Sequence, residues 1–249
     1  MTITRAWAPV ILVAIATISA ACDRADTSAA PVTTTSPAGS STAPSSAAAK
    51  ARDHALVRVV DAVPSGTNFD LFAGDLILFD GLGFKSVSAY RALDGKRYAF
   101  SLRPAGMPKA QPLSSNTENL EDGAYYTAFA IPEDGHGPRL RIVEDDLNVP
   151  AAGKARLRVV HGGIGAGAID LRASGSADVL FDTVDYQAVT GYKDVATMNG
   201  AIQISIKGQP APAVTVPNAH LEAGRYYTLV ILGSAPKLEA LLIEDALTP

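Results

Sequence analysis

Apolar and polar residues alternate with a period of two along most of the chain beyond residue 55. Runs such as YAFSL, YYTAFAI, IQISI and YYTLVIL are also rich in β-branched and aromatic residues. This pattern is typical of strands, because successive side chains of a strand point to opposite faces of its sheet. Groups of Gly, Pro, Asn and Asp separate the runs at a spacing of roughly 8–12 residues. The pattern therefore predicts an all-β protein.

The second half of this region repeats the first at an offset of about 100 residues. LVRVVDAVPSGTNFDLFAG (56–74) aligns with RLRVVHGGIGAGAIDLRAS (156–174), and LEDGAYYT (120–127) aligns with LEAGRYYT (221–228) at six of eight positions. The offset drifts only between apolar runs, where loops tolerate insertions. Such self-similarity indicates tandem copies of one domain.

Each copy holds enough runs for seven or eight short strands, which predicts two tandem Ig-like antiparallel β-sandwich domains. The expected bounds are residues 55–149 and 150–249. We expect each domain to be a self-sufficient unit.

Three pairs of tyrosines recur in the two copies: Tyr90 and Tyr192, Tyr125 and Tyr226, Tyr126 and Tyr227. They could form a binding face or belong to the core. The Gly-x-Tyr spacing before Tyr125 and Tyr226 resembles a tyrosine corner, in which the phenol bonds a nearby backbone carbonyl. We favour core positions for that pair and leave the other two pairs open.

The stretch GGIGAG (162–167) has Gly163, Gly165 and Ala168 at the spacing of a dinucleotide-binding turn. Such a turn holds a pyrophosphate only where it opens a helix, and the residues that follow here alternate like a strand. The equivalent loop of the first copy, AVPSGTNF (62–69), has a proline and one glycine. A connection between two strands accepts both versions, so we predict a loop rather than a nucleotide site.

The sequence selects no catalytic or metal-binding set. Its four histidines stand singly, without metal-ligand spacing: His54, His136, His161 and His220. His161 ends an apolar run where the first copy has Asp61, which predicts a polar strand end bonded to its own loop. No G-x-S-x-G turn is present, and no carboxylate pair is singled out for sugar hydrolysis.

Acidic residues gather at the end of each copy, as EDD (144–146) and ED (244–245). Near Asp70 or Asp170 they could bind Ca²⁺, which takes six to eight oxygen ligands. No EF-hand loop or calcium-binding nonapeptide repeat is present. The favoured interpretation is a solvated strand end that also discourages pairing between sheet edges.

The first 22 residues have the pattern of a signal peptide. Arg5 precedes the apolar run APVILVAIATI (8–18), and small residues lead to Cys22, the only cysteine. The run is too short for a membrane-spanning helix. Its end resembles the lipobox of bacterial lipoproteins, whose cysteine becomes the lipid-bearing first residue. We therefore predict lipidation of Cys22; the alternative is ordinary cleavage after Ala21. Asp23 resembles an inner-membrane retention signal.

Residues 23–54 consist mainly of Ala, Ser, Thr and Pro without an apolar period. Such a segment buries too little surface to offset its chain entropy, so we predict a disordered tether. The net charge of −4 provides no basic field for nucleic acid. A single cysteine also excludes an intrachain disulfide.

Both copies are similar to the bacterial family known as domain of unknown function 4397 (DUF4397). The resemblance rests on VRVVDAVPSGTNFDLF and LRVVHGGIGAGAIDLR at the start of the copies. At their ends it rests on LEDGAYYTAFAI with RIVEDD, and on LEAGRYYTLVIL with LLIEDAL. It implies an exported lipoprotein or surface protein with tandem Ig-like domains, and supplies no catalytic residue. A first-strand histidine followed by Ala-x-Pro is usual in the family. The first copy has Asp61 with Ala62 and Pro64, whereas the second keeps His161 without the proline.

Together these patterns predict a lipid-anchored protein of the bacterial cell envelope that faces the periplasm. We expect a non-enzymatic binding or structural role without a cofactor, with an envelope protein or glycan as ligand. The alternative is an envelope hydrolase or metal-dependent enzyme with an unrecognised site. A further alternative is that one copy binds a ligand and the other spaces it from the membrane.

Overall fold

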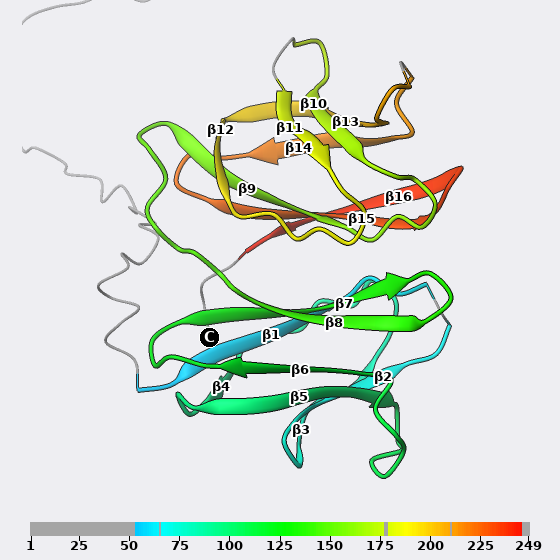
Figure 1. Ribbon diagram of the computed structural model, residues 1–249. Helices are drawn as coiled ribbons and strands as arrows, with labels where there is room; N and C mark the ends of the chain where they lie inside the picture. Colours follow the sequence, from blue (N-terminus) through cyan, green and yellow to red (C-terminus); the bar gives the residue numbers. More distant parts are fainter. Residues whose placement is uncertain (1–52, 65, 177–178, 210, 246–249) are drawn as a thin grey trace, which may run out of the picture. The chain divides into compact units, whose positions relative to one another are not determined.

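The computed structural model describes residues 53–64, 66–176, 179–209 and 211–245, all within one compact unit, Ser41–Pro249. These residues form sixteen strands in four sheets and no helix (Figure 1). The predicted all-β class with two β-sandwiches is confirmed. No helix in this part of the chain is long and apolar enough to cross a membrane. The predicted signal peptide, the lipidation of Cys22 and almost all of the predicted tether lie outside the described residues.

The first eight strands form repeat 1. They are β1 (Ala55–Asp61), β2 (Phe69–Ala73), β3 (Leu76–Leu82), β4 (Arg91–Leu93), β5 (Arg97–Pro104), β6 (Ser114–Asn119), β7 (Tyr125–Glu133) and β8 (Gly137–Glu144). One sheet has the order β4-β1-β7-β8 and is called inner sheet 1 here; the other, outer sheet 1, has the order β3-β2-β5-β6.

The last eight strands form repeat 2 with the same order. They are β9 (Lys154–His161), β10 (Ile169–Ala173), β11 (Val179–Val184), β12 (Lys193–Ala196), β13 (Met198–Ile206), β14 (Val214–Leu221), β15 (Tyr226–Ser234) and β16 (Lys237–Glu244). Inner sheet 2 is β12-β9-β15-β16, and outer sheet 2 is β11-β10-β13-β14.

Each inner sheet contains one parallel pair of strands. β1 runs parallel to β7, with Leu56 opposite Tyr125, and β9 runs parallel to β15. The prediction of wholly antiparallel sandwiches is therefore corrected at these two pairs, and an Ig-like arrangement is not confirmed. A parallel pair needs a long crossover connection, and strands β2–β6 or β10–β14 provide it.

Each sandwich has its own core between its inner and outer sheets. In repeat 1 this core includes Val57, Leu71 and Phe100; in repeat 2 it includes Leu157 and Ile204. These residues are the inward half of the alternation that the sequence shows. Burial of apolar side chains against a second sheet is what stabilises a sandwich.

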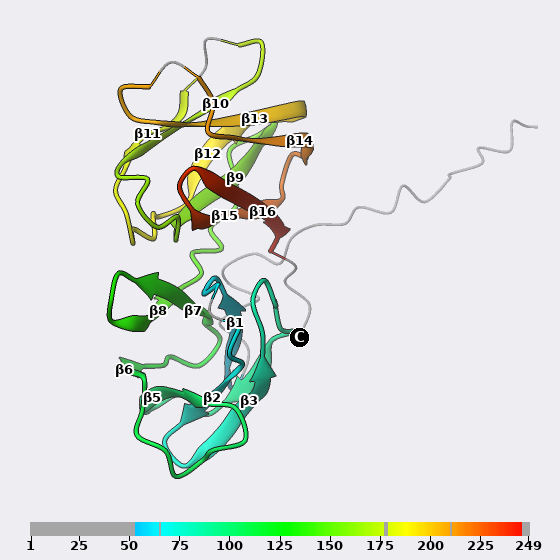
Figure 2. The ribbon, with the colours of Figure 1, turned by 90° about the vertical axis from the view of Figure 1, so that its right-hand side faces the viewer.

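The inner sheets of the two repeats face each other (Figures 1 and 2). The face that each inner sheet turns toward the other repeat is therefore buried as well. Every residue of β1 is buried, and so is nearly every residue of β7 and β15. Val60 and Phe129 of repeat 1 belong to one apolar cluster with Val160 and Val230 of repeat 2. The expectation of self-sufficient domains is thus corrected, because each repeat covers an apolar face of the other.

Candidate functional site

Two arginines at equivalent positions lie in the contact between the repeats. Arg58 in β1 is 3% exposed and Arg158 in β9 is 1% exposed. Arg58 forms an ion pair with Asp245 of repeat 2, and Arg158 Nη1 lies 2.6 Å from Asp145 Oδ1 of repeat 1. Each arginine therefore pairs with the carboxylate of the other repeat.

A threonine in each repeat connects these charges. Thr127 Oγ1 lies 2.8 Å from both carboxylate oxygens of Asp145 and accepts a hydrogen bond from Arg58 Nε at 2.9 Å. In repeat 2, Thr228 Oγ1 donates to Asp245 and accepts from Nε of Arg158 at 2.8 Å. The hydroxyl thus links the carboxylate and the arginine of one repeat, while the ion pairs run between repeats.

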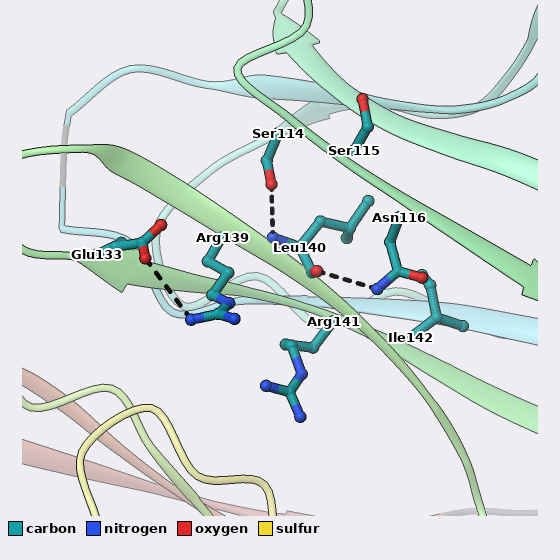
Figure 3. A pocket seen from close by; sticks show the side chains of 8 residues that line it. All are labelled: Ser114, Ser115, Asn116, Glu133, Arg139, Leu140, Arg141 and Ile142. Atoms are coloured by element: carbon teal, nitrogen blue, oxygen red, sulfur yellow. Dashed lines mark hydrogen bonds and ion pairs between the residues drawn. The ribbon is translucent and has the colours of Figure 1, made fainter.

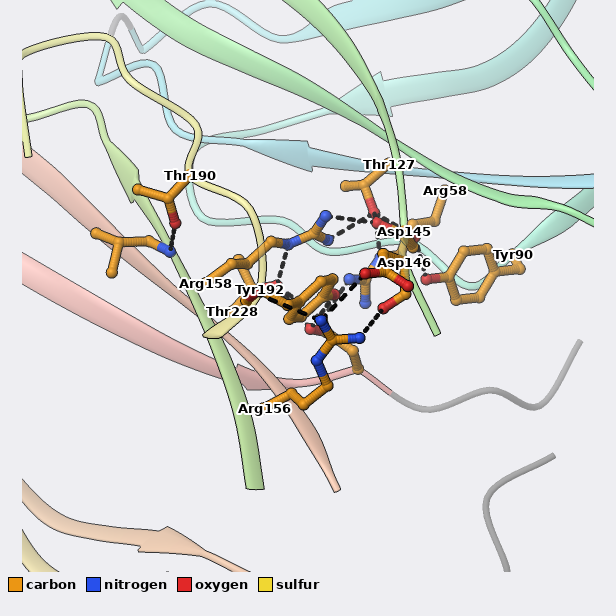
Figure 4. A network of polar contacts seen from close by, with 12 residues as sticks. Arg58, Tyr90, Thr127, Asp145, Asp146, Arg156, Arg158, Thr190, Tyr192 and Thr228 are labelled. Carbon is orange, nitrogen blue, oxygen red and sulfur yellow. Dashed lines mark hydrogen bonds and ion pairs between the residues drawn. The ribbon is translucent and has the colours of Figure 1, made fainter. Parts of the chain in front are cut away.

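A tyrosine completes each half of the arrangement (Figure 4). Tyr90 Oη donates to Asp145 at 2.7 Å, and Tyr192 Oη donates to Asp245 at 2.7 Å. The guanidinium of Arg158 also lies 4.6 Å from the ring centre of Tyr192. We call the whole set the crossed network. Its members are Arg58, Tyr90, Thr127, Asp145, Arg158, Tyr192, Thr228 and Asp245.

The surroundings of the crossed network raise the pKa of its arginines and of its tyrosines. Burial lowers the pKa of Arg58, but Asp245, Tyr90 and Asp145 together outweigh it, so the pKa is raised above the usual value. For Arg158 burial is outweighed in the same way by Asp145, Tyr192 and Asp245 together. Burial raises the pKa of Tyr90 and Tyr192, and the carboxylate that each phenol contacts raises it further. Both arginines therefore stay charged and both phenols stay protonated at neutral pH.

The tyrosine predictions are confirmed in part. Tyr125 and Tyr226 are buried, as expected. Tyr125 packs edge-to-face on Tyr90 at 5.1 Å, and Tyr226 packs on Tyr192 at 6.0 Å. Tyr226 Oη donates to the carbonyl of Leu147 at 2.9 Å, across the contact between the repeats.

The corner-type hydrogen bond belongs to the neighbouring tyrosines, which corrects the assignment made from spacing. Tyr126 Oη accepts from the amide of Glu121 at 3.0 Å, and Tyr227 Oη accepts from the amide of Glu222 at 3.1 Å. Adjacent residues of a strand face opposite sides. In repeat 2 the bond to the segment just upstream is therefore made by Tyr227, whereas the phenol of Tyr226 bonds the carbonyl of Leu147.

The glycine-rich stretch is a loop between strands, as predicted, since β10 rather than a helix follows it. His161 Nδ1 accepts from the Gly163 amide at 3.2 Å, and His161 Nε2 lies 2.8 Å from the Gly167 carbonyl. Asp61 plays the same part in repeat 1, where its Oδ1 accepts from the Val63 amide at 2.8 Å. The prediction that these polar strand ends bond their own loops is confirmed.

The absence of side chains at Gly162 and Gly163 has a packing reason. A Cβ on Gly163 would lie 2.9 Å from Leu238 Cδ2, and one on Gly162 would lie 3.2 Å from Pro132 of the other repeat. Contacts this short force a shift of neighbouring atoms. These glycines therefore allow the loop to lie close to its neighbours, which repeat 1 achieves with a different loop sequence.

The acidic clusters are not simply solvated strand ends, which corrects that interpretation. Asp145 and Asp245 are buried in the crossed network, and Asp146 pairs with Arg156 at 3.0 Å. Asp70 accepts backbone hydrogen bonds from Gly81 in β3 and from Gly106 after β5, and Asp170 accepts one from Thr183. Among the described residues no group of three or more His, Cys, Asp or Glu is placed to hold a metal ion.

An open groove lies along β8 at the seam of the repeat 1 sandwich (Figure 3). Its volume is about 610 Å³, and its lining residues are Ser114, Ser115, Asn116, Glu133, Arg139, Leu140, Arg141 and Ile142. Ser114 Oγ accepts from the Leu140 amide at 2.9 Å, and Asn116 Nδ2 lies 3.4 Å from the Leu140 carbonyl. Side chains of β6 thus contact the outward edge of β8, and we call this feature the β8 groove.

Repeat 2 has apolar residues at the same seam. The strand registers place Val214 and Val216 where repeat 1 has Ser114 and Asn116. These two valines pack with Ala240 and Leu242 against the repeat 2 core. The two copies therefore share a fold but differ in the chemistry of this seam.

Sequence reasoning did not single out the two arginines or the two threonines. A signal was present, because all four residue types of the crossed network recur at equivalent positions in both copies. The β8 groove was not predicted either. Its signal in the sequence is a difference between the two copies rather than a recurrence. Ser114 and Asn116 are polar where the second copy is apolar.

The fold and the crossed network define a protein of two β-sandwich repeats that share an internal contact. The chain belongs to the family described as Domain of unknown function (DUF4397), whose model matches residues 55–172 and 174–249. The resemblance seen in the sequence is thereby confirmed. None of the curated proteins compared with the chain matches it.

Several solved structures show a distant likeness. The C-terminal domain of AlgF from P. aeruginosa is 16% identical with a TM-score of 0.31, over 37% of this chain and 99% of that one. The Bacillus anthracis TIE protein is 13% identical with a TM-score of 0.24, over 72% and 34%. A candidate cell adhesion protein from Bacteroides uniformis is 10% identical with a TM-score of 0.22, over 79% and 100%. At such scores the likeness transfers no property to this chain.

Proposed function

We propose that the protein is a lipid-anchored binding module of the cell envelope, in which repeat 1 binds the ligand and repeat 2 supports it. The observation that carries this proposal is the difference between two copies of one fold. The seam carries polar side chains in repeat 1, whereas two valines occupy the equivalent positions in repeat 2. If repeat 1 binds the ligand, polar residues are expected at this seam in repeat 1 only.

The crossed network supports a role in display rather than in catalysis. Asp145 and Asp245 each contact an arginine, a threonine and a tyrosine, so neither is available as an acid or a base. Two buried ion pairs and a shared apolar cluster hold the repeats together. Contacts that hold the two repeats together support display of the β8 groove in one orientation, which would lower the entropy cost of binding.

The anchor in this proposal comes from the sequence, where Cys22 ends the apolar leader. The variant Cys22→Ser should move the protein from the membrane fraction to the soluble periplasmic fraction. Incorporation of a labelled fatty acid should disappear with it. Persistence of both membrane association and label in this variant would refute the anchor.

The binding role is tested by a photo-crosslinking amino acid placed in the β8 groove in living cells. Ser115 is exposed in repeat 1, and Thr215 occupies the equivalent exposed position in repeat 2. We expect a discrete adduct from position 115 and none from position 215. Equal adducts at both positions, or none at either, would contradict binding by repeat 1.

A further inference from the structure

We infer that the β8 groove binds an extended acidic peptide segment of a partner protein, laid along the edge of β8. This inference rests on the proposed function and adds the chemistry of the ligand. Three features of repeat 1 lead to it: the edge of β8, which is only partly bonded, an arginine without a partner among the described residues, and a seam whose polar residues are apolar in the duplicate.

The first feature is the edge of the strand itself. β8 pairs only with β7, so its other side carries outward amide and carbonyl groups. At Leu140 these groups meet Ser114 and Asn116. Outward backbone groups recur at every second residue of an antiparallel edge, so those of Ile142 point the same way, and no described side chain bonds them. An extended peptide is the ligand that matches a row of such groups.

The second feature is the charge beside this edge. Arg139 pairs with Glu133 at 3.6 Å and donates to Gln187 at 3.0 Å. Arg141 forms no hydrogen bond or ion pair with any described residue, and its guanidinium points away from Glu133 (Figure 3). A guanidinium binds a carboxylate through two parallel hydrogen bonds. The unpaired Arg141 therefore selects an acidic side chain on the peptide.

The third feature is the comparison with repeat 2. The registers place Glu239 and Leu241 where repeat 1 has Arg139 and Arg141, and Lys85 of repeat 1 already holds Glu239 at 2.5 Å. Repeat 2 thus has neither the polar seam residues nor an arginine at the two equivalent positions of its edge strand. The residues that favour an acidic strand occur together in one copy and are replaced together in the other.

Two other occupants fit less well. The lining of the β8 groove contains no aromatic ring, although aromatic side chains are common in sites for small organic ligands and sugar units. A second copy of this chain, pairing its β8 edge to edge, would bring the arginines of both copies together. An acidic side chain on an extended peptide matches the backbone groups of Ile142 and the charge of Arg141.

The test uses full-length protein in mild detergent and a fluorescein-labelled hexaglutamate peptide, with fluorescence anisotropy as the readout. We expect saturable binding of hexaglutamate, no binding of hexaglutamine, and weaker binding when alternate backbone amides of hexaglutamate are methylated. Methylation leaves the charge unchanged but blocks strand pairing. Equal binding of the methylated peptide would overturn the strand geometry. Binding of an oligouronate in place of hexaglutamate would identify a glycan instead.

Variants locate the binding site. Arg141→Glu should weaken hexaglutamate binding at least tenfold, whereas Arg172→Glu, an exposed change in outer sheet 2, should leave it unchanged. The double variant Ser114→Val with Asn116→Val copies the closed seam of repeat 2 and should also lose binding while remaining folded. Equal losses from Arg141→Glu and Arg172→Glu would show general charge attraction and overturn the inference.

The two proposals fail in distinguishable ways. A specific adduct at position 115 in cells, together with no binding of hexaglutamate, would leave the proposed function standing and remove the acidic peptide. Absence of the adduct would count against the proposed function itself.

Discussion

Arg58 and Asp245 form a buried ion pair across 187 positions of the chain. The equivalent pair joins Arg158 to Asp145, so each repeat supplies the arginine that neutralises a carboxylate of the other. The carboxylates remain bonded to the threonine and tyrosine of their own repeat. Separation of the repeats would therefore deprive four charged side chains of their ion-pair partners.

Removal of one partner of this pair should destabilise the whole protein. Arg58→Met leaves the Asp245 carboxylate buried without its cation, which costs about 3–5 kcal/mol of unfolding free energy. The double variant Arg58→Met with Asp245→Leu should recover much of that loss. Urea denaturation followed by circular dichroism measures both. A loss of less than about 1 kcal/mol in the single variant would show that the ion pair is not essential.

The phenols of Tyr90 and Tyr192 in the crossed network should contribute more to the free energy of unfolding than the phenol of Tyr126 does. Tyr192→Phe removes a hydrogen bond to a buried carboxylate, worth about 1.5–3 kcal/mol, and Tyr90→Phe should match it by symmetry. Tyr126→Phe removes only an acceptor for the amide of Glu121, a neutral bond worth about 0.5–1.5 kcal/mol. The three variants are compared by chemical denaturation. Equal losses in all three would contradict the role assigned to the carboxylates.

The carboxyl of Asp61 should make stability depend on pH. Burial raises its pKa from 3.8 to about 6, against the Val63 hydrogen bond, which lowers it, and its Oδ2 has no hydrogen-bond partner. A raised folded pKa contributes stability below pH 3.8 that is lost as the pH rises through about 6. Asp61→Asn should therefore stabilise the protein above about pH 6, and this gain should shrink to nothing near pH 4. Urea midpoints across this range measure it, and a gain independent of pH would refute the titration.

Gly163→Ala should be destabilising by about 1–3 kcal/mol, because overpacking forces neighbouring atoms to move. The new Cβ would lie 2.9 Å from Leu238 and 3.2 Å from the ring of His161. Gly191→Ala is the matched control, since a Cβ there meets nothing within 4 Å. Thermal unfolding compares the two variants. Equal melting temperatures would mean that close packing does not explain this glycine.

The alternation of apolar and polar residues predicted most of the fold but did not predict the contact between the two repeats. Alternation in β8 and β16 was readable because one face of each is apolar. In β1 and β7 nearly every residue is buried. The run YYTAFAI was expected to alternate, but Thr127 is its one polar residue apart from the tyrosines, and a nearly continuous apolar run is typical of a strand buried on both faces. A sequence can show that the second face of a strand is covered, but not which segment covers it. The apolar cluster shared by the two repeats could therefore not be predicted.

The partners of the crossed network were also beyond a single sequence. Asp145 and Asp245 are equivalent residues of the two copies. From the sequence alone, each would be expected to pair with the arginine of its own repeat. The structure instead exchanges the partners, and only the three-dimensional contact between inner sheets determines that choice. The β8 groove, in contrast, was within reach, because it lies where the duplicated strands differ in polarity.

The exchange of partners ties folding to the order of synthesis. Repeat 1 leaves the ribosome first, yet the carboxylate that completes Arg58 follows 187 residues later. Until then the outer face of inner sheet 1 stays uncovered, and an uncovered apolar sheet attracts other unfolded chains. Repeat 1 is therefore more prone to aggregation than the complete protein until repeat 2 has folded against it.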